Sequence, residues 1–166
     1  MLTVNELFSG IGAQAKALER LNIPHRIVCT SDIDKDAILS YAAVHCGLLE
    51  KYKDFIENTE ITNDLLIKMR DELLEKGINI NPKNKKKLPL YWYAVQLSNN
   101  IGDISKIPEL PYADMWTYSF PCQSISLAGR REGIIKGVTR SGLLYEVQRL
   151  LEKARDNSTP PRISDT

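Results

Sequence analysis

The sequence is poor in the residues that build disulfide frameworks and metal sites. Its 166 residues include three cysteines (Cys29, Cys46 and Cys122) and only two histidines. The cysteines form no Cys-x-x-Cys pair and lie in no His-rich cluster, which argues against both a disulfide framework and a zinc site. We therefore expect no bound metal.

An excess of one charge and long apolar runs are also missing. The formal net charge is +1, from 22 basic and 21 acidic residues, so the chain has no overall basic field to attract nucleic acid. No signal-peptide pattern and no apolar run of membrane-spanning length are present, so we expect a cytoplasmic protein without membrane contact. The length suits a single domain with a real core.

The first pattern with chemical content is a strand, a glycine turn and a helix. A predicted strand at residues 2–8 leads into Ser9-Gly10-Ile11-Gly12, and a helical pattern follows from Ala13 to Leu21. Glycines let a backbone approach a ligand closely, and a helix N-terminus offers free N–H groups. The pattern favours a nucleotide-type ligand, although it lacks the third glycine of the dinucleotide fingerprint.

Acidic residues follow two further predicted strands. Residues 26–31 form a β-type run that ends in Asp32-Ile33-Asp34, and Gly102-Asp103-Ile104 repeats the arrangement later. An acid at the end of the second strand binds ribose hydroxyls in doubly wound folds, and a second acceptor suits an exocyclic amine. Each acid alone is more typical of a turn or a helix cap. Together, after a glycine turn, they predict an adenosine pocket.

The stretch Ser119-Phe120-Pro121-Cys122-Gln123 places a thiol directly after a proline, at the end of a predicted strand over residues 114–120. Proline fixes its own φ and pushes the preceding residue toward an extended conformation. A nucleophile needs such a fixed position facing a cleft. The alternative is a buried structural cysteine.

These segments, in this order, resemble the DNA (cytosine-5) methyltransferase family. Phe8-Ser9-Gly10-Ile11-Gly12 is similar to its first motif, and Asp32-Ile33-Asp34 to its second, where the family more often has Glu first. The third, fourth and fifth motifs resemble Gly102-Asp103-Ile104, Ser119 to Gln123, and Ser141 to Val147. The resemblance covers residues 1–46 and about 100–155.

The resemblance implies S-adenosylmethionine as cofactor and double-stranded DNA as substrate. Asp32 would take the ribose hydroxyls, Ile33 would pack on adenine, and Asp103 would read the adenine amino group. The cofactor-binding set implied in this way is Phe8, Gly10, Ile11, Gly12, Asp32, Ile33, Asp103, Ile104 and Leu143.

The implied chemistry is covalent catalysis by Cys122. Thiolate attack at C6 of cytosine makes C5 nucleophilic enough to accept a methyl group, and the base must first flip out of the duplex. The residues expected to contact the base or the phosphates are Pro121, Gln123, Arg130 and Arg131.

The departures from the family are also informative. No Glu-Asn-Val motif follows Val147, and no counterpart of the target-recognition domain is present. We expect residues 1–156 to be the cofactor-binding catalytic subdomain and residues 157–166 a tail, in an incomplete chain that is weak or inactive alone. A bare sheet edge would then favour self-association or a complementing C-terminal polypeptide.

The expected fold is α/β, a doubly wound, Rossmann-like methyltransferase sheet with strands in the order third, second, first, fourth. Residues 35–46 read as a second helix, with His45 as a capping or surface residue, and His25 in a turn. Residues 47–100 read as an inserted helical hairpin that includes a helix capped by Asn63. The aromatic run at residues 91–93 is expected to pack.

Two other functions fit parts of the pattern. A non-catalytic S-adenosylmethionine-binding half or remnant would explain the missing motifs. A nucleotide-dependent oxidoreductase fits the glycine turn but not Pro121-Cys122-Gln123. RNA cytosine methylation uses related chemistry, but the motif order is more similar to the DNA family.

Overall fold

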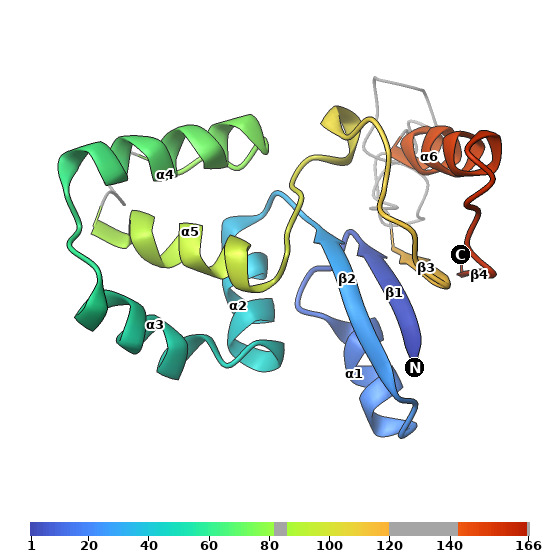
Figure 1. Cartoon of the computed structure of the whole chain (residues 1–166), viewed down its shortest axis with the longest axis horizontal. Helices are drawn as coiled ribbons and strands as arrows, with labels where there is room; N and C mark the ends of the chain where they lie inside the picture. Colours follow the sequence, from blue (N-terminus) through green and yellow to red (C-terminus); the bar gives the residue numbers. More distant parts are fainter. Residues whose placement is uncertain (82–85, 120–142, 166) are drawn as a thin grey trace, which may run out of the picture.

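The computed structural model describes residues 1–81, 86–119 and 143–165, with only the backbone of Asp165 (Figure 1). Its centre is a parallel sheet with the strand order β2–β1–β3–β4. The strands are β1 (Leu2–Leu7), β2 (His25–Ser31), β3 (Met115–Tyr118) and β4 (Ile163–Asp165). The helices are α1 (Ala13–Arg20), α2 (Lys35–His45), α3 (Leu48–Asn58), α4 (Asn63–Glu75), α5 (Leu88–Leu97), the 3-10 turn η2 (Ile104–Lys106) and α6 (Leu144–Asp156).

Helices cover both faces of the sheet, as expected for a doubly wound fold. Leu7 and Trp116 face α6 and share a buried cluster with Val147 and Leu150. The neighbouring residue in β1, Glu6, points to the opposite face, where it bonds to α1 and α2. Strand β1 is therefore buried on both sides, the usual state of a central parallel strand. The predicted α/β fold is confirmed.

The expected third strand is reduced to one bridge. Asn100 pairs in parallel with Thr30 of β2, on the side of the sheet where the predicted order places that strand. Extension is interrupted on both sides of this bridge, because Asn99 has φ 47° and Gly102 has φ 85°. The side chain of Asn100 accepts a hydrogen bond from the Gly102 amide at 2.7 Å, which favours a turn over a longer strand.

The edge of the sheet also differs from the expectation. Strand β3, which precedes Ser119, was expected to be an unpaired edge. Instead, β4 pairs with it in parallel, with Met115 opposite Ile163. The amides of Arg162 and Ile163 both donate to the Asp114 carbonyl, which aligns β4 before the pairing begins. Among the described strands, β4 is the last on this side of the sheet, and it lies within the range predicted to be a tail.

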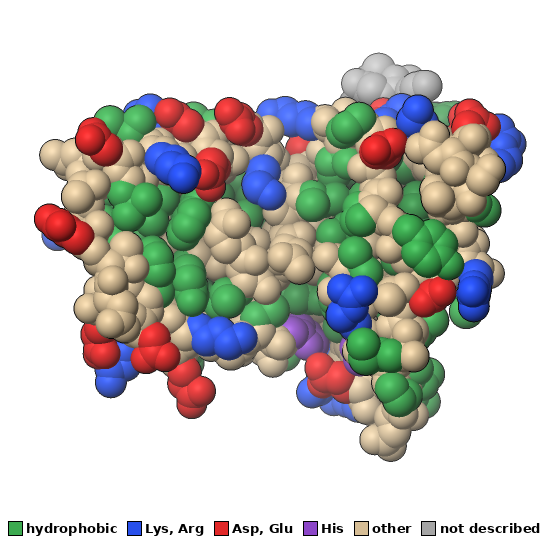
Figure 2. Space-filling model, in the orientation of Figure 1, with side chains coloured by type: hydrophobic (Ala, Val, Ile, Leu, Met, Phe, Trp, Pro, Cys, Tyr) green, Lys and Arg blue, Asp and Glu red, His purple; other side chains and the backbone are tan. Residues whose placement is uncertain are grey.

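The range predicted to be a helical hairpin, residues 47–100, holds three α-helices in the part that the structure describes. In Figure 1, α3, α4 and α5 lie together on the left of the view, away from β1 and β3. They share a second core with α2, which includes Ile38, Met69, Leu73 and Val95. Figure 2 shows apolar side chains between the charged rims of this helical group.

Of two predictions about these helices, the one on the cap of α4 is wrong and the one on the packing of α5 is right. Helix α4 is capped by Thr62, whose hydroxyl accepts from the Leu65 amide at 3.2 Å, so the assignment of the cap to Asn63 is wrong. The predicted packing of the aromatic run in α5 is confirmed. Tyr91 is buried, and Tyr93 stacks on Phe55 with ring centroids 4.6 Å apart. Within the described ranges, no helix combines the length and apolar character needed to cross a bilayer.

Candidate cofactor site

A cavity of about 540 Å³ lies at the carboxyl ends of β1, β2 and β3. In an open parallel sheet this is the edge where ligands bind. The residues that line the cavity are Phe8, Ser31, Asp32, Ile33, Asp34, Gly102, Asp103, Ile104, Ser105, Ser119 and Leu143. Segments far apart in the sequence meet here because parallel strands end at the same edge.

The cavity gathers most of the residues predicted to bind the cofactor, namely Phe8, Asp32, Ile33, Asp103, Ile104 and Leu143. The glycine turn lies beside it rather than in its wall. The amide of Gly10 donates to Asp32 Oδ2 at 2.8 Å, whereas Ile11 and Gly12 line a separate groove along α1. The predicted segments therefore meet at one edge of the sheet. The glycine turn contacts Asp32 of the cavity wall but does not line the cavity itself.

Asp32 fixes the relative positions of the turn and the end of β2. Its Oδ2 accepts from Gly10, and its Oδ1 accepts from the Asp34 amide at 2.9 Å. A carboxylate has about four acceptor positions, so two remain after the contacts that the described residues make. Asp34 has a different task, because its Oδ1 accepts from the amides of Asp36 and Ala37 and caps α2.

Asp103 is held by backbone and side-chain contacts on one oxygen only. Its Oδ1 accepts from the Ser105 amide at 2.9 Å and from the Ser105 hydroxyl at 2.7 Å. Its own amide donates to the Lys76 carbonyl at 2.8 Å. Within the described residues no donor reaches Oδ2, so this oxygen is free to accept a hydrogen bond from a ligand.

Gly102 brings this acceptor into place. Its carbonyl accepts from the Ser31 hydroxyl at 2.7 Å, which ties the segment to the end of β2. A Cβ at Gly102 would lie 2.1 Å from the Lys76 carbonyl oxygen, so α4 approaches too closely for any side chain. Ser31 and Lys76 were not singled out by sequence reasoning, because only tertiary contact shows their role.

Sequence reasoning also did not single out Glu6, which contacts the start of α1 directly after the glycine turn. The N-cap of α1 is Gly12, which has no side chain to cap the helix. The fully buried Glu6 takes this role, since its Oε1 accepts from the Ala15 amide at 3.2 Å and its Oε2 accepts from the Tyr41 hydroxyl at 2.8 Å. Burial raises the pKa of Glu6, against the opposing effect of these hydrogen bonds. A glutamate within a predicted strand was the available signal in the sequence.

The predicted catalytic and substrate-binding residues, Pro121, Cys122, Gln123, Arg130 and Arg131, lie outside the described residues. Ser119, three residues before Cys122 in the sequence, lines the cavity. The two cysteines within the described ranges are poor nucleophiles. Burial raises the pKa of Cys29 to about 12 and also raises the pKa of Cys46. No metal-binding cluster of His, Cys, Asp and Glu occurs among the residues described.

A family model for C-5 cytosine-specific DNA methylases matches residues 76–160, about half of the chain. The chain belongs to this family. The match includes Gly102-Asp103-Ile104 and the Pro121-Cys122-Gln123 motif, so the resemblance seen in the sequence is confirmed. As a family member, the protein places its cavity where the family's first, second and third motifs meet.

Known proteins of this kind are similar along nearly the whole chain. The type II methyltransferase M2.ScrFI of Lactococcus lactis subsp. cremoris is 43% identical over 92% of this chain and 44% of its own length. The orphan methyltransferase M.SssI of Spiroplasma monobiae is 35% identical over 96% of this chain and 44% of its own length. The chain thus spans less than half the length of these relatives. A solved structure, the S. pombe Dnmt2 methyltransferase, aligns with a TM-score of 0.42 at 22% identity, over 92% of this chain and 32% of that one.

Proposed function

We propose that this chain binds S-adenosylmethionine in the 540 Å³ cavity and takes part in methylating C5 of cytosine in double-stranded DNA, as in restriction-modification or phage enzymes. The observation that carries the proposal is the convergence of Asp32 and Asp103 on one cavity, whose lining also includes the apolar residues Phe8, Ile33, Ile104 and Leu143. Each has an acceptor position left after its contacts with the described residues.

The chemistry of the cavity fits the adenosine part of this cofactor. The free acceptor positions of Asp32 suit the two ribose hydroxyls, and Oδ2 of Asp103 suits the adenine amino group. Ile33 is 53% exposed beside the cavity, which leaves its side chain available to cover an aromatic ring. Bound S-adenosylmethionine supplies an electrophilic methyl group on a sulfonium centre.

Within this proposal, Cys122 is the nucleophile. Its thiolate forms a bond to C6 of cytosine, and the electron pair moved onto the ring lets C5 take the methyl group. Loss of the C5 proton then expels the thiolate and restores the ring. Pro121, Gln123, Arg130 and Arg131 are proposed to contact the flipped base and the DNA phosphates.

Replacing Cys122 with serine tests the chemical part of the proposal. Transfer of radiolabelled methyl groups to plasmid DNA is expected to fall to background, because a serine hydroxyl is not ionised at neutral pH. The assay compares both chains alone and mixed with the C-terminal part of M2.ScrFI, which supplies the length that this chain does not span. Methyl transfer above background that is equal for the two chains would contradict the role of Cys122.

We further propose that the exposed edge of β4 pairs with a second polypeptide, either another copy of the chain or a complementing C-terminal segment. Among the described strands, β4 pairs with β3 alone, and Ile163 is half exposed. Unpaired edge groups favour the addition of a strand. Sedimentation velocity over a concentration series is expected to show self-association that replacing Ser164 with proline abolishes. A chain that sediments as a monomer at all concentrations, and that does not bind the C-terminal segment, would exclude the interface.

A further inference from the structure

Residues 97–103 lead from the end of α5 to Asp103, the acceptor proposed for the adenine amino group. The sheet holds the start of this segment. The Thr30 amide donates to the Asn99 carbonyl at 3.2 Å, and the Thr30 carbonyl accepts from the Ile101 amide at 2.9 Å. Strand β2 therefore fixes the segment as far as Ile101, and the position of Asp103 depends on the contacts that follow.

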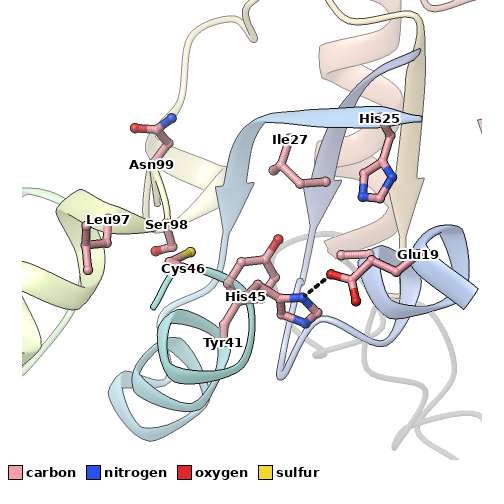
Figure 3. Close-up of a pocket in the computed structure, with 10 residues that line it drawn as sticks. Glu19, His25, Ile27, Tyr41, His45, Cys46, Leu97, Ser98 and Asn99 are labelled. Atoms are coloured by element: carbon pink, nitrogen blue, oxygen red, sulfur yellow. Dashed lines mark hydrogen bonds and ion pairs between the residues drawn. The ribbon is translucent and has the colours of Figure 1, made fainter. Parts of the chain in front are cut away.

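A cavity of about 260 Å³ lies beside the start of this segment and is lined by both histidines of the chain (Figure 3). The side chain of His45 is only 6% exposed, so the expectation of a capping or surface residue is wrong. His25 is not in a turn either, because it is the first residue of β2. Figure 3 shows the His45 ring directed at Glu19 of α1, and the His25 ring contacts the Ile23 carbonyl. Support for the end of the segment that carries Asp103 comes from another element.

That element is α4, whose last residue contacts both ends of the turn at residues 100–103. Lys76 Nζ donates to the Asn100 carbonyl at 2.6 Å, and the Lys76 carbonyl accepts from the Asp103 amide at 2.8 Å. Between these two bonds, the backbone of Gly102 packs directly on the Lys76 carbonyl. A single residue thus spans the turn that presents Asp103.

The way in which α4 ends brings Lys76 to this position. The amides of Gly77 and Ile78 donate back into the last turn of α4 at 3.0 and 2.8 Å, which are the two bonds of a Schellman motif. Gly77 has φ 77°, as this motif requires, and a Cβ there would lie 2.9 Å from the Cβ of Asp103. The end of α4 is therefore shaped for close contact with the segment that carries Asp103.

Two lysines link α4 to this segment, and Lys76 makes the stronger link. Its side chain is half-buried, and the 2.6 Å bond from its ammonium group to the Asn100 carbonyl is short and charge-assisted. Lys106 of η2 reaches back to the carbonyls of Leu74 and Glu75, but both distances are 3.4 Å and the contacts are exposed. Loss of the Lys76 ammonium should therefore loosen the turn more than loss of Lys106.

We propose that Lys76 is a positioning residue for Asp103, which it holds within reach of the adenine amino group. Lys76 is not among the described residues that line the cavity, so it acts through the turn and not by touching the cofactor. The inference rests on the proposed function in one respect: the cavity must bind S-adenosylmethionine. Through Lys76, the helical group α3–α5 then takes part in cofactor binding.

The first test needs no cofactor. Lys76→Met keeps the aliphatic stem but cannot donate to the Asn100 carbonyl. In hydrogen exchange followed by NMR on the whole chain, the Asp103 amide is expected to exchange about tenfold faster in this variant, because the turn is held at one end less. The Ile101 amide, held by Thr30, should keep its wild-type rate. An unchanged Asp103 amide, or equal acceleration of both amides, would overturn the inference.

Two variants control this comparison. Lys76→Arg retains a cationic donor and is expected to restore the slow exchange of the Asp103 amide. Lys68→Met removes an exposed lysine of the same helix, which lies 3.9 Å from Glu72, and should match wild type. An arginine variant that exchanges as fast as the methionine variant would contradict the role of a donor at this position.

The second test is a double-mutant cycle on S-adenosylmethionine affinity, measured by calorimetry. Lys76→Met is expected to weaken binding about tenfold in the wild-type chain but less than about twofold in Asp103→Ala, where no carboxylate remains to be positioned. Lys68→Met should leave the affinity unchanged. Equal losses in the two backgrounds would indicate a general structural role and contradict the inference. Absence of binding by every chain refutes the proposed function instead, and the exchange of the Asp103 amide then decides the role of Lys76.

Discussion

Glu6→Leu is expected to lower the free energy of unfolding by about 3 kcal/mol. Leucine has a similar volume and suits a buried strand position, so the loss comes from polar groups rather than from a cavity. The Ala15 amide and the Tyr41 hydroxyl both donate to Glu6 and would be left without a partner in the core. Urea unfolding followed by tryptophan fluorescence measures the effect.

Glu6→Gln is the matched control. Its carbonyl oxygen can accept from Ala15 while its amide donates to the Tyr41 oxygen, so we expect stability within about 1 kcal/mol of wild type at pH 7. The two proteins should differ in pH dependence. Because the pKa of Glu6 is raised from 4.5 in the folded state, wild-type stability falls as pH rises above about 4.5, and this component disappears in the glutamine variant. A leucine variant as stable as the glutamine variant would show that Glu6 does not cap α1.

Gly102→Ala is expected to destabilise the chain by about 3 kcal/mol and to deform the cofactor cavity. The new Cβ meets the Lys76 carbonyl oxygen at 2.1 Å and its carbonyl carbon at 2.8 Å, so the backbone of the α4 C-terminus must move. The positive φ of Gly102 adds strain for any other residue. Thermal unfolding and the binding of S-adenosylmethionine report the two effects.

Gly10→Ala separates backbone strain from steric conflict. Gly10 also has a positive φ, of 53°, but a Cβ there meets no atom within 4 Å. Only the conformational cost of about 1 kcal/mol is expected. Equal losses in the two variants would mean that the close approach of Lys76 to Gly102 does not constrain the cavity.

The sequence allowed prediction of the features that depend on local order along the chain. The glycine turn, the acids after the strands and the doubly wound arrangement follow from strand–turn–helix patterns, and parallel topology then places Asp32 and Asp103 at one edge. The cap of α4 was misplaced by one residue because Thr62 and Asn63 are both good caps, and only the backbone conformation distinguishes them.

The remaining features depend on contacts between distant residues. The predicted third strand is reduced to the Asn100 bridge because Asn99 and Gly102 adopt positive φ values, which the apolar pattern does not reveal. The side chain of His45 is largely covered because Glu19 and the glycine turn lie against it. Glu6 is identified as a helix cap only when Ala15 is seen above it. Each of these depends on packing between elements rather than on periodicity within one.

Calorimetric titration of S-adenosylmethionine into the purified chain tests the central claim most directly. The account predicts saturable binding that Asp103→Ala weakens at least about tenfold, since it removes the free acceptor in the cavity. Asp54→Ala, at an exposed acid of α3 remote from the cavity lining, should leave the affinity unchanged. A folded chain that gives no binding heat at any temperature, or that binds equally well without the Asp103 carboxylate, would contradict the account.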